Sequence, residues 1–368
     1  MTARFRLRQA WIIARLEVKR LFLSRRGLWV YGLALLPALL FFIHAADMRY
    51  RLAQYRRGGL TAPAALEAVQ PGMTEEQVIQ TAGKAPEDRQ WRRRKWTERR
   101  EGGRQITEER EIRARRMAYF DGRRRFIFYF ENGILHDMHR VQIMNFSEDR
   151  EVFAAIFQYY YLRLAVFFGC LGIFLNLFRG EMMDRTLHFW LLAPVRREVL
   201  LAGKFLAGWT AATVIFSGGA LLAFAAMLWP HLGAEARAWW QGPGPEHALR
   251  YALAAAAGCA GYGSLFLAAS LWIRNPIVPA AVLLVWEAAR GFLPALLQKF
   301  TVLYYLEPLC PLPAPLDPDL PSLLRLLLTP AAPLPPGLAL AGIALFSALV
   351  LRAAVAGVRR LEINYGTD

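Results

Sequence analysis

The sequence has few of the side chains that bind metal ions or act as nucleophiles. Its 368 residues include six histidines and three cysteines, and neither type is grouped with the spacing of a metal site. Two of the cysteines, Cys170 and Cys259, lie in long apolar stretches, where a thiol acts as a small packing group. No combination of serine, histidine and aspartate indicates a catalytic triad. A zinc site, a disulfide framework and a membrane-embedded hydrolase are therefore disfavoured.

The sequence also lacks a phosphate-binding loop for ATP. Such a loop has the pattern Gly-x-x-x-x-Gly-Lys-Ser/Thr, in which backbone N–H groups surround the phosphates. The pair Gly203-Lys204 has neither the earlier glycine nor the following hydroxyl, and an apolar stretch follows it directly. We therefore expect that the chain is not an enzyme by itself and that it holds no cofactor or metal ion.

Apolar residues, in contrast, make up 55% of the chain, and they are gathered into blocks rather than spread periodically. Blocks of about 20 apolar residues are long enough to cross a bilayer as helices. The sequence therefore predicts an α-helical polytopic membrane protein. Its six transmembrane helices are expected near residues 27–45, 152–177, 205–228, 249–273, 277–297 and 337–358.

Residues 1–26 form a cationic arm, in which eight arginines and lysines face a single acid, Glu17. Apolar residues such as Trp11 and Leu16 give the arm one apolar stripe, which predicts an amphipathic elbow helix along the lipid headgroups. The long cationic region, and the charged residues that follow position 45, argue against a cleavable signal peptide. We therefore expect that the first span is retained.

Six spans place both termini on one side of the membrane. The positive charge of the arm, of segment 179–204 and of the tail 359–368 predicts that this side is the cytoplasm, with the chain in the cell (inner) membrane. Lipid headgroups and topology thus explain the net charge of +16, and we reject nucleic-acid binding.

Residues 46–150 are polar and rich in arginine with interleaved acids, which indicates a folded insert between the first and second spans. Thr74 is placed to cap a helix over Met73–Ala82. Strands are expected at Arg125–Phe130 and Leu135–Val141, joined by an Asn-Gly turn. We therefore predict a small α+β soluble domain. Because long loops translocate largely regardless of their charge, we expect it on the extracytoplasmic side.

Segment 179–204 separates two apolar spans and mixes apolar with charged residues. Its apolar side chains recur every three or four positions, as in a helix that lies on a surface: Met182, Leu187, Trp190, Leu191 and Val195. Pro194 ends the first helical stretch and a second begins after it, which predicts a helix, a corner and a helix. Such a segment suits the transmission of force between a soluble partner and the spans. An ordinary amphipathic interfacial loop is the alternative.

Two features inside the predicted spans leave their roles open. Glu287 and Arg290 lie three residues apart on one helix face, where they can pair. They form either a structural ion pair or part of a translocation path. Gly258, Gly261 and Gly263 permit close helix packing, which is favoured within one subunit over a dimer interface.

Several of these motifs resemble the membrane subunit of an ABC-2 type transporter. The resemblance rests on Gly180-Glu181, Thr186-Leu187, the run 193–198 and Gly203-Lys204, together with the six spans and the cationic N-terminal helix. Arg185 stands where the family often has glycine, and Arg196 where it often has serine.

The resemblance implies a permease that pairs with a separate ABC ATPase subunit, on which ATP and Mg are bound. It also implies a second permease copy, in a homodimer or a heterodimer, and a coupling helix that contacts the ATPase. The residues expected to couple are Glu181, Asp184, Arg185, Thr186, Pro194, Arg196, Arg197 and Glu198.

The insert has a second resemblance, to the small α+β domain of the SmpA/OmlA lipoprotein group. It is carried by residues 68–78, by Gly83-Lys84-Ala85-Pro86 and by residues 128–135. The arginine-rich middle departs from that pattern, and no lipobox cysteine is present. The resemblance implies the fold, and we expect an extracytoplasmic docking or gating role toward a protein partner.

The sequence therefore predicts the permease subunit of an ATP-driven exporter, embedded among membrane lipids. The alternative is a membrane scaffold that does not transport and recruits envelope proteins through its insert. Only the permease needs an ATPase on its inner face. Apolar spans with few charges fit lipids, peptides or drugs equally well, so the substrate stays open.

Overall fold

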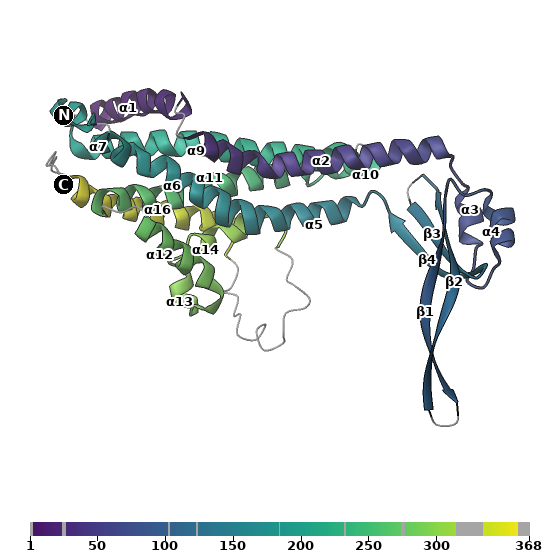
Figure 1. Cartoon of the computed structure of the whole chain (residues 1–368). Helices are drawn as coiled ribbons and strands as arrows, with labels where there is room; N and C mark the ends of the chain where they lie inside the picture. Colours follow the sequence, from purple (N-terminus) through teal and green to yellow (C-terminus); the bar gives the residue numbers. More distant parts are fainter. Residues whose placement is uncertain are drawn as a thin grey trace. The chain divides into compact units, whose positions relative to one another are not determined.

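The structure is a computed structural model that describes residues 3–23, 27–101, 104–122, 124–183, 185–231, 233–273, 277–313 and 334–359. The chain divides into two compact units (Figure 1). One unit consists of Met1–Phe42 and Ser147–Asp368, and the other of Ile43–Phe146. The first is built of helices, and the second contains the strands of the chain's four-stranded sheet.

Five segments among the described residues are long and apolar enough to cross a membrane. The first is α2 (Leu28–Gly58). The second, Phe146–Met183, joins α5 (Phe146–Ile156), η2 (Phe157–Ala165), α6 (Val166–Leu175), η3 (Asn176–Gly180) and α7 (Glu181–Met183). The others are α9 (Arg197–Leu228) with η4 (Trp229–His231), α11 (Gly244–Trp272) and α16 (Pro336–Arg359), and the short α10 (Ala234–Gln241) lies between α9 and α11. They coincide with five of the six predicted spans.

Helix α11 is the most enclosed of these segments and packs against α6, α9 and α16. A Cβ atom on Gly263 would lie 2.4 Å from the ring of Phe174, and one on Gly261 would lie 2.8 Å from Ile343. Side chains cannot approach so closely, so these glycines let neighbouring helices of the same chain pack. The predicted packing within one subunit is confirmed at these two positions.

The predicted span near 277–297 is not one continuous helix. Helix α12 (Ile277–Ala288) is followed by a 3-10 turn, η5 (Ala289–Phe292), and by the short helix α13 (Ala295–Gln298). Leu293 adopts an extended conformation, with φ −80° and ψ 143°, because it precedes Pro294. Twelve helical residues rise only about 18 Å, which is less than the apolar thickness of a bilayer. The chain then continues through α14 (Leu303–Leu306) and η6 (Glu307–Leu309).

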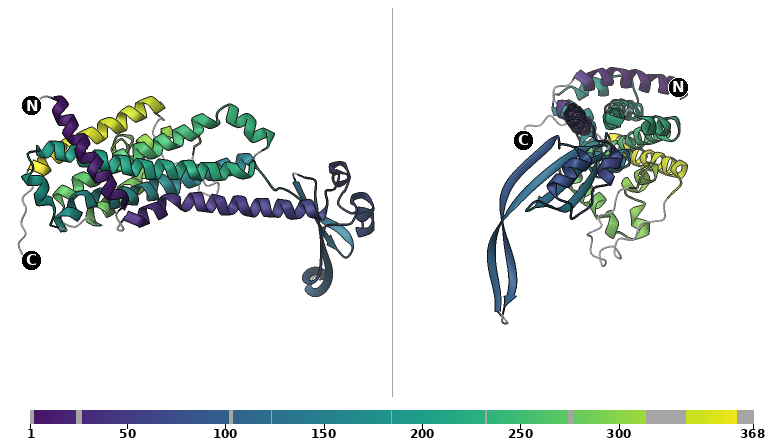
Figure 2. Two further views of the ribbon diagram at one scale, coloured as in Figure 1. Left: turned by 90° about the horizontal axis from the view of Figure 1, so that it is seen from above. Right: turned by 90° about the vertical axis from the view of Figure 1, so that its right-hand side faces the viewer.

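The N-terminal helix α1 (Ala3–Leu23) is confirmed and crosses α9 within the helical unit (Figure 2). The predicted helix, corner and helix between the second and third segments is also present. Helix α8 (Leu187–Leu192) ends before Ala193, whose extended backbone precedes Pro194, and α9 begins at Arg197.

The second unit is the predicted α+β domain. Its strands β1 (Glu87–Glu101), β2 (Arg104–Phe120), β3 (Arg124–Glu131) and β4 (Ile134–Gln142) form an antiparallel sheet in the order β1-β2-β3-β4. Two helices accompany the sheet, α3 (Pro63–Glu67) and α4 (Glu75–Ala82). Thr74 caps α4 as predicted, because its hydroxyl accepts the N–H of Gln77 while the Gln77 side chain accepts the N–H of Thr74.

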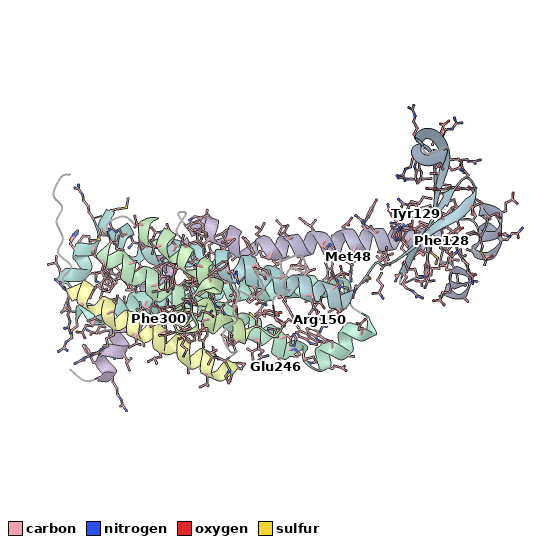
Figure 3. All side chains as sticks on the ribbon, turned by 90° about the horizontal axis from the view of Figure 1, so that it is seen from below. Met48, Phe128, Tyr129, Arg150, Glu246 and Phe300 are labelled. Atoms are coloured by element: carbon pink, nitrogen blue, oxygen red, sulfur yellow. The ribbon has the colours of Figure 1, made fainter. Side chains whose placement is uncertain are left out.

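The sheet unit has its own apolar core. Helix residues such as Val78 pack against the alternate residues Phe126, Phe128 and Phe130 of β3. Tyr129 lies on the opposite face of the strand from Phe128, as the two-residue period of a strand requires (both are labelled in Figure 3). The complete core consists of Leu66, Val69, Val78, Ala82, Met117, Tyr119, Phe126, Phe128, Phe130 and Leu135.

Candidate functional site

A buried lysine lies where α1, α7 and α9 meet. The side chain of Lys204, in the second turn of α9, has no exposed surface. Its Nζ lies 2.8 Å from Oε2 of Glu181 in α7 and 3.0 Å from Oε1 of Glu17 in α1. It also donates a hydrogen bond of 2.8 Å to the carbonyl oxygen of Leu177. One ammonium group thus holds together three helical segments that are far apart in the sequence.

Two further side chains complete the site around Glu181. Arg20, from the last turn of α1, lies 2.9 Å from Oε1 of Glu181, and half of its side chain is exposed. The indole N–H of Trp190 in α8 donates to the same oxygen at 3.1 Å. The Trp190 ring also lies 5.5 Å from Nζ of Lys204, within cation–π range. Glu17, Arg20, Glu181 and Lys204 are named here the buried charge cluster.

The buried charge cluster is electrically balanced. It contains two carboxylates, from Glu17 and Glu181, and two cations, from Arg20 and Lys204. Charges are costly to remove from water unless they are paired and hydrogen-bonded, and here each charge has an oppositely charged neighbour. The arrangement therefore holds one geometry of α1, α7 and α9 and penalises their separation.

The local sequence explains how α1 approaches α9 so closely. The buried residues of α1 are Ala10, Ile13, Ala14 and Glu17, spaced by three and four as on one helix face. A Cβ atom on Gly203 would lie 2.8 Å from Ile13 and 3.0 Å from the carbonyl oxygen of Ala10. Glycine at position 203 thus permits the contact that places Lys204 beside Glu17.

The predicted coupling segment begins at the buried charge cluster. The N–H of Thr186 donates to the carbonyl oxygen of Glu181 at 2.9 Å. Between them, Arg185 has a φ of +54°, in the left-handed region that a residue without Cβ adopts most easily. The chain therefore reverses sharply after α7 and enters α8. Asp184, which we also expected to couple, lies outside the described residues.

Three large apolar side chains of this segment are exposed. Met183, Phe189 and Leu192 are 79%, 67% and 80% exposed. Leu187, in contrast, is buried, and Trp190 is held by its hydrogen bond to Glu181. One side of α8 is thus anchored to the helices, while the other side presents large apolar groups.

The end of the segment contacts α16 instead. Arg197 donates to the carbonyl oxygens of Arg359 at 2.6 Å and Val358 at 3.4 Å, and Glu198 accepts from Nε of Arg359 at 3.1 Å. A cation at the last carbonyl groups of a helix is favourable. Arg197 and Glu198 are therefore engaged inside the chain, whereas Pro194 and Arg196 are exposed.

A family model described as ABC-2 family transporter protein matches residues 11–285, which is more than half of the chain. The chain belongs to the ABC-2 transporter family. Comparison with curated proteins gave no match, and comparison with solved structures gave none either. The matched residues include the whole buried charge cluster and the segment that follows it.

Membership of the ABC-2 family makes this chain a membrane transport component, the permease subunit of an ABC transporter. The family implies a separate ATPase subunit as its partner, and the permease is not itself the catalytic component. The apolar helices and the family together place the chain in a membrane.

In this ABC-2 chain, Glu287 and Arg290 have separate partners. The carboxylate of Glu287 accepts the N–H groups of Val302 at 2.7 Å and Leu303 at 3.2 Å. Arg290 forms an ion pair with Glu307. The predicted pairing between Glu287 and Arg290 is thus replaced by two longer-range contacts, because the break after α12 folds the chain back upon itself.

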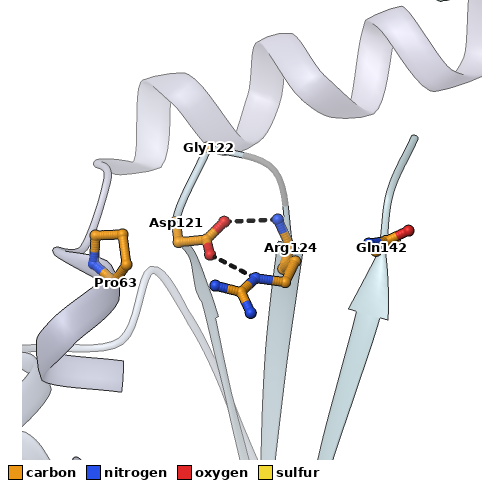
Figure 4. A pocket seen from close by; sticks show the side chains of 5 residues that line it. All are labelled: Pro63, Asp121, Gly122, Arg124 and Gln142. Atoms are coloured by element: carbon orange, nitrogen blue, oxygen red, sulfur yellow. Dashed lines mark hydrogen bonds and ion pairs between the residues drawn. The ribbon is translucent and has the colours of Figure 1, made fainter. Parts of the chain in front are cut away.

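The sheet unit contains a polar pocket lined by Pro63, Asp121, Gly122, Arg124 and Gln142 (Figure 4). Asp121 accepts from the N–H of Arg124 at 2.6 Å and from its Nε at 3.1 Å. Arg124 also donates to Glu67 at 3.0 Å. The charges of the pocket neutralise one another, so the pocket supplies no argument for a ligand. Within the described ranges, no group of three or more His, Cys, Asp or Glu side chains could hold a metal ion.

Sequence reasoning placed Glu181 in the site but missed Glu17, Arg20 and Lys204. Two signals were present in the sequence. Glu17 is the single acid of a strongly cationic arm, and Lys204 is a cation at the start of an apolar span. Either charge alone suggests the membrane interface, and only the fold shows that the two meet.

Proposed function

We propose that this permease belongs to an exporter and that residues 181–198 form its coupling surface for the ATPase. The observation that supports this assignment is the construction of α8. Its outer side exposes Phe189 and Leu192, while its inner side is anchored to the buried charge cluster through Trp190. Exposed apolar side chains that lie together are typical of protein interfaces.

The anchoring suggests how force would pass. A displacement of α8 acts on Glu181 through Trp190, and Glu181 is held by Lys204 of α9 and by Arg20 of α1. Closure of the ATPase, which would bind ATP and Mg²⁺, would therefore move α8, α9 and α1 together. We assign the alternation of access to a path between two permease copies. We place both termini in the cytoplasm, because the end of α16 contacts the start of α9 through Arg359 and Glu198, and α1 contacts α7 through Arg20 and Glu181.

The sheet unit is assigned to the extracytoplasmic side, as a domain of the SmpA/OmlA type that docks a protein partner. The extracytoplasmic side is supported by the length of the insert, because long loops cross the membrane largely regardless of their charge. The type of domain is supported by the motifs around Thr74. Whether the second permease copy is identical does not affect the coupling mechanism.

The coupling surface is tested by the double variant Phe189→Glu with Leu192→Glu. Both side chains are exposed, so the change leaves the buried charge cluster intact. We expect that the ATPase co-purifying with the tagged protein in mild detergent falls by about tenfold or more, as for the loss of interface hot spots. The ATPase activity of the eluate should fall in parallel.

The matched control is Ile134→Glu with Val141→Glu in β4, where two exposed apolar residues lie far along the sequence from α8. This variant should retain the ATPase. Unchanged co-purification for the α8 variant would refute the coupling surface, and envelope proteins without any ATPase would favour the scaffold instead. Arg197 and Glu198 are less suitable targets, because their change also breaks contacts with α16.

A further inference from the structure

The strands β1 and β2 extend beyond the rest of the sheet (Figure 1). They pair along the whole of β1, but β2 pairs with β3 only from Ala114 to Phe120. From the pair Arg92 and Arg113 outward, the two strands form a ribbon without a third strand. A two-stranded ribbon with no apolar core is only marginally stable in water. An external surface that the ribbon binds would account for its length.

The ribbon carries a large part of the chain's positive charge. Residues 89–116 include twelve arginines and lysines and five acids, which gives +7 out of the total of +16. Around its base, the side chain of Arg92 is 81% exposed and Trp91 is 41% exposed. The exposed residues Arg89, Trp91, Arg92, Arg93, Arg94 and Arg113 are named here the basic ribbon.

The pairing of the strands increases the local density of charge. Arg92 lies directly opposite Arg113, and Arg89 lies opposite Arg116. Like charges in opposite positions destabilise a pair of strands, and a bound anion removes the repulsion. Two of these arginines also lie near an acid, since Arg92 is 3.7 Å from Glu111 and Arg116 is 3.5 Å from Glu87. Both pairs are long and partly exposed to solvent, where an ion pair contributes little. Arg115, by comparison, pairs closely with both Glu75 and Asp88.

The membrane surface is the nearest extended anionic surface. Within the sheet unit, charged residues of α2 begin at Asp47, which marks the end of its apolar stretch. Tyr55 lies two turns further along the helix, about 12 Å away, and contacts Phe120 of the sheet at 5.4 Å between ring centroids. Residues 87–94 of β1 extend about 25 Å, which is more than this distance, so the basic ribbon is long enough to reach the headgroups.

We propose that the basic ribbon binds the phosphate groups of anionic phospholipids at the surface of the membrane that α2 crosses. Guanidinium groups match phosphate oxygens in a two-pronged geometry, and tryptophan favours the interface between headgroups and acyl chains. Because the ribbon is covalently joined to a span, its effective concentration at this surface is high even where each contact is weak. This inference does not depend on the ATPase partner.

The test uses the full-length protein in nanodiscs made of phosphatidylcholine alone or with phosphatidylglycerol. Thr97→Cys places one label in β1, opposite Glu108, and the native cysteines are all buried. Quenching of the labelled fluorophore by a nitroxide on the lipid headgroup reports contact. We expect quenching at least about twofold stronger with phosphatidylglycerol, and its loss when salt rises from about 50 to about 500 mM.

Two variants show whether the ribbon itself makes the contact. The triple variant Arg92→Glu, Arg93→Glu and Arg94→Glu should abolish the lipid-dependent quenching. The triple variant Arg92→Lys, Arg93→Lys and Arg94→Lys should retain most of it. The matched control, Arg56→Glu with Arg57→Glu and Arg140→Glu, changes the net charge equally at exposed positions outside the ribbon and should keep the quenching.

Equal quenching in the two kinds of nanodisc would overturn the proposal. So would an equal loss in the control variant, since the effect would then reflect net charge alone. If the lipid quencher does not reach the ribbon and the ribbon instead binds an acidic protein, the proposal is also overturned.

Discussion

The substitution Lys204→Met tests the buried charge cluster most directly. Methionine has nearly the volume of lysine, so packing is retained while the charge is lost. Glu17 then loses the partner that lies at 3.0 Å, and it stays buried between α1 and α9. Removing one member of a buried ion pair costs about 3–5 kcal/mol, because the remaining charge is uncompensated.

Two comparison variants separate charge from packing. Arg20→Met removes a cation whose side chain is half exposed, so we expect a cost of about 1 kcal/mol or less. Glu17→Gln combined with Lys204→Met leaves only Glu181 and Arg20 charged, which restores neutrality. The double variant should therefore be about 1–3 kcal/mol more stable than Lys204→Met alone.

The assay is a titration of the purified protein in mixed micelles with sodium dodecyl sulfate, in which far-UV circular dichroism gives the free energy of unfolding. Transport or stimulated ATPase activity of each variant is measured in parallel. If Lys204→Met costs no more than Arg20→Met, or if neutralising Glu17 gives no recovery, the reasoning about the buried charge cluster is refuted.

Two further predictions concern local structure. Arg185→Gly should raise the free energy of unfolding by up to about 1 kcal/mol, because glycine adopts the φ of +54° freely, whereas Arg185→Val should lower it by about 1–2 kcal/mol; the same titration checks both, and effects of the same sign would contradict the assignment. In the sheet unit, the hydrogen bonds from Arg115 lower the pKa of Asp88, so this carboxylate stabilises the fold above its unfolded pKa of about 4 and loses that effect as pH falls through its folded pKa. Hydrogen exchange of β1 and β2 in the full chain should therefore accelerate, after correction for intrinsic rates, in that acidic range, and Asp88→Asn should remove the dependence.

Features that depend on neighbouring residues were predictable from the sequence. The cap at Thr74 needs only Gln77, and the turn between β3 and β4 needs only Asn132 and Gly133, whose φ values are +50° and +86°. The long apolar helices followed from composition in the same way. These interactions join residues only a few positions apart, so the local sequence contains all the information that they require.

The strands β1 and β2 were missed because they lack the alternation of apolar and polar residues that indicates a strand. β2 forms its backbone hydrogen bonds to β3 from Ala114 onward, and β1 pairs with β2. The position of β1 and β2 therefore depends on β3 and not on their own side-chain pattern. The break at Leu293 was missed because the prediction of a span at 277–297 followed its apolar composition. The local effect of Pro294, which disfavours the helical conformation of the residue before it, was not taken into account.

The buried charge cluster depends on distant residues. Glu17 and Lys204 are separated by 187 positions, and Arg20 and Glu181 by 161. No periodicity joins such pairs, and each charge taken alone has an adequate explanation in the membrane interface. The pairing follows only once Gly203 lets α1 approach α9.

The residues of the coupling segment thus divide into two groups with different physical roles. Glu181, Arg197 and Glu198 bind inside the chain, to Lys204 of α9 and to the end of α16. Phe189 and Leu192, which were not among the predicted coupling residues, are exposed, as are the predicted residues Pro194 and Arg196. Because both ends of the segment are joined to spans, a partner that moves α8 displaces several helices together. Substitutions in the first group should therefore reduce stability and coupling together, whereas those in the second should reduce coupling alone.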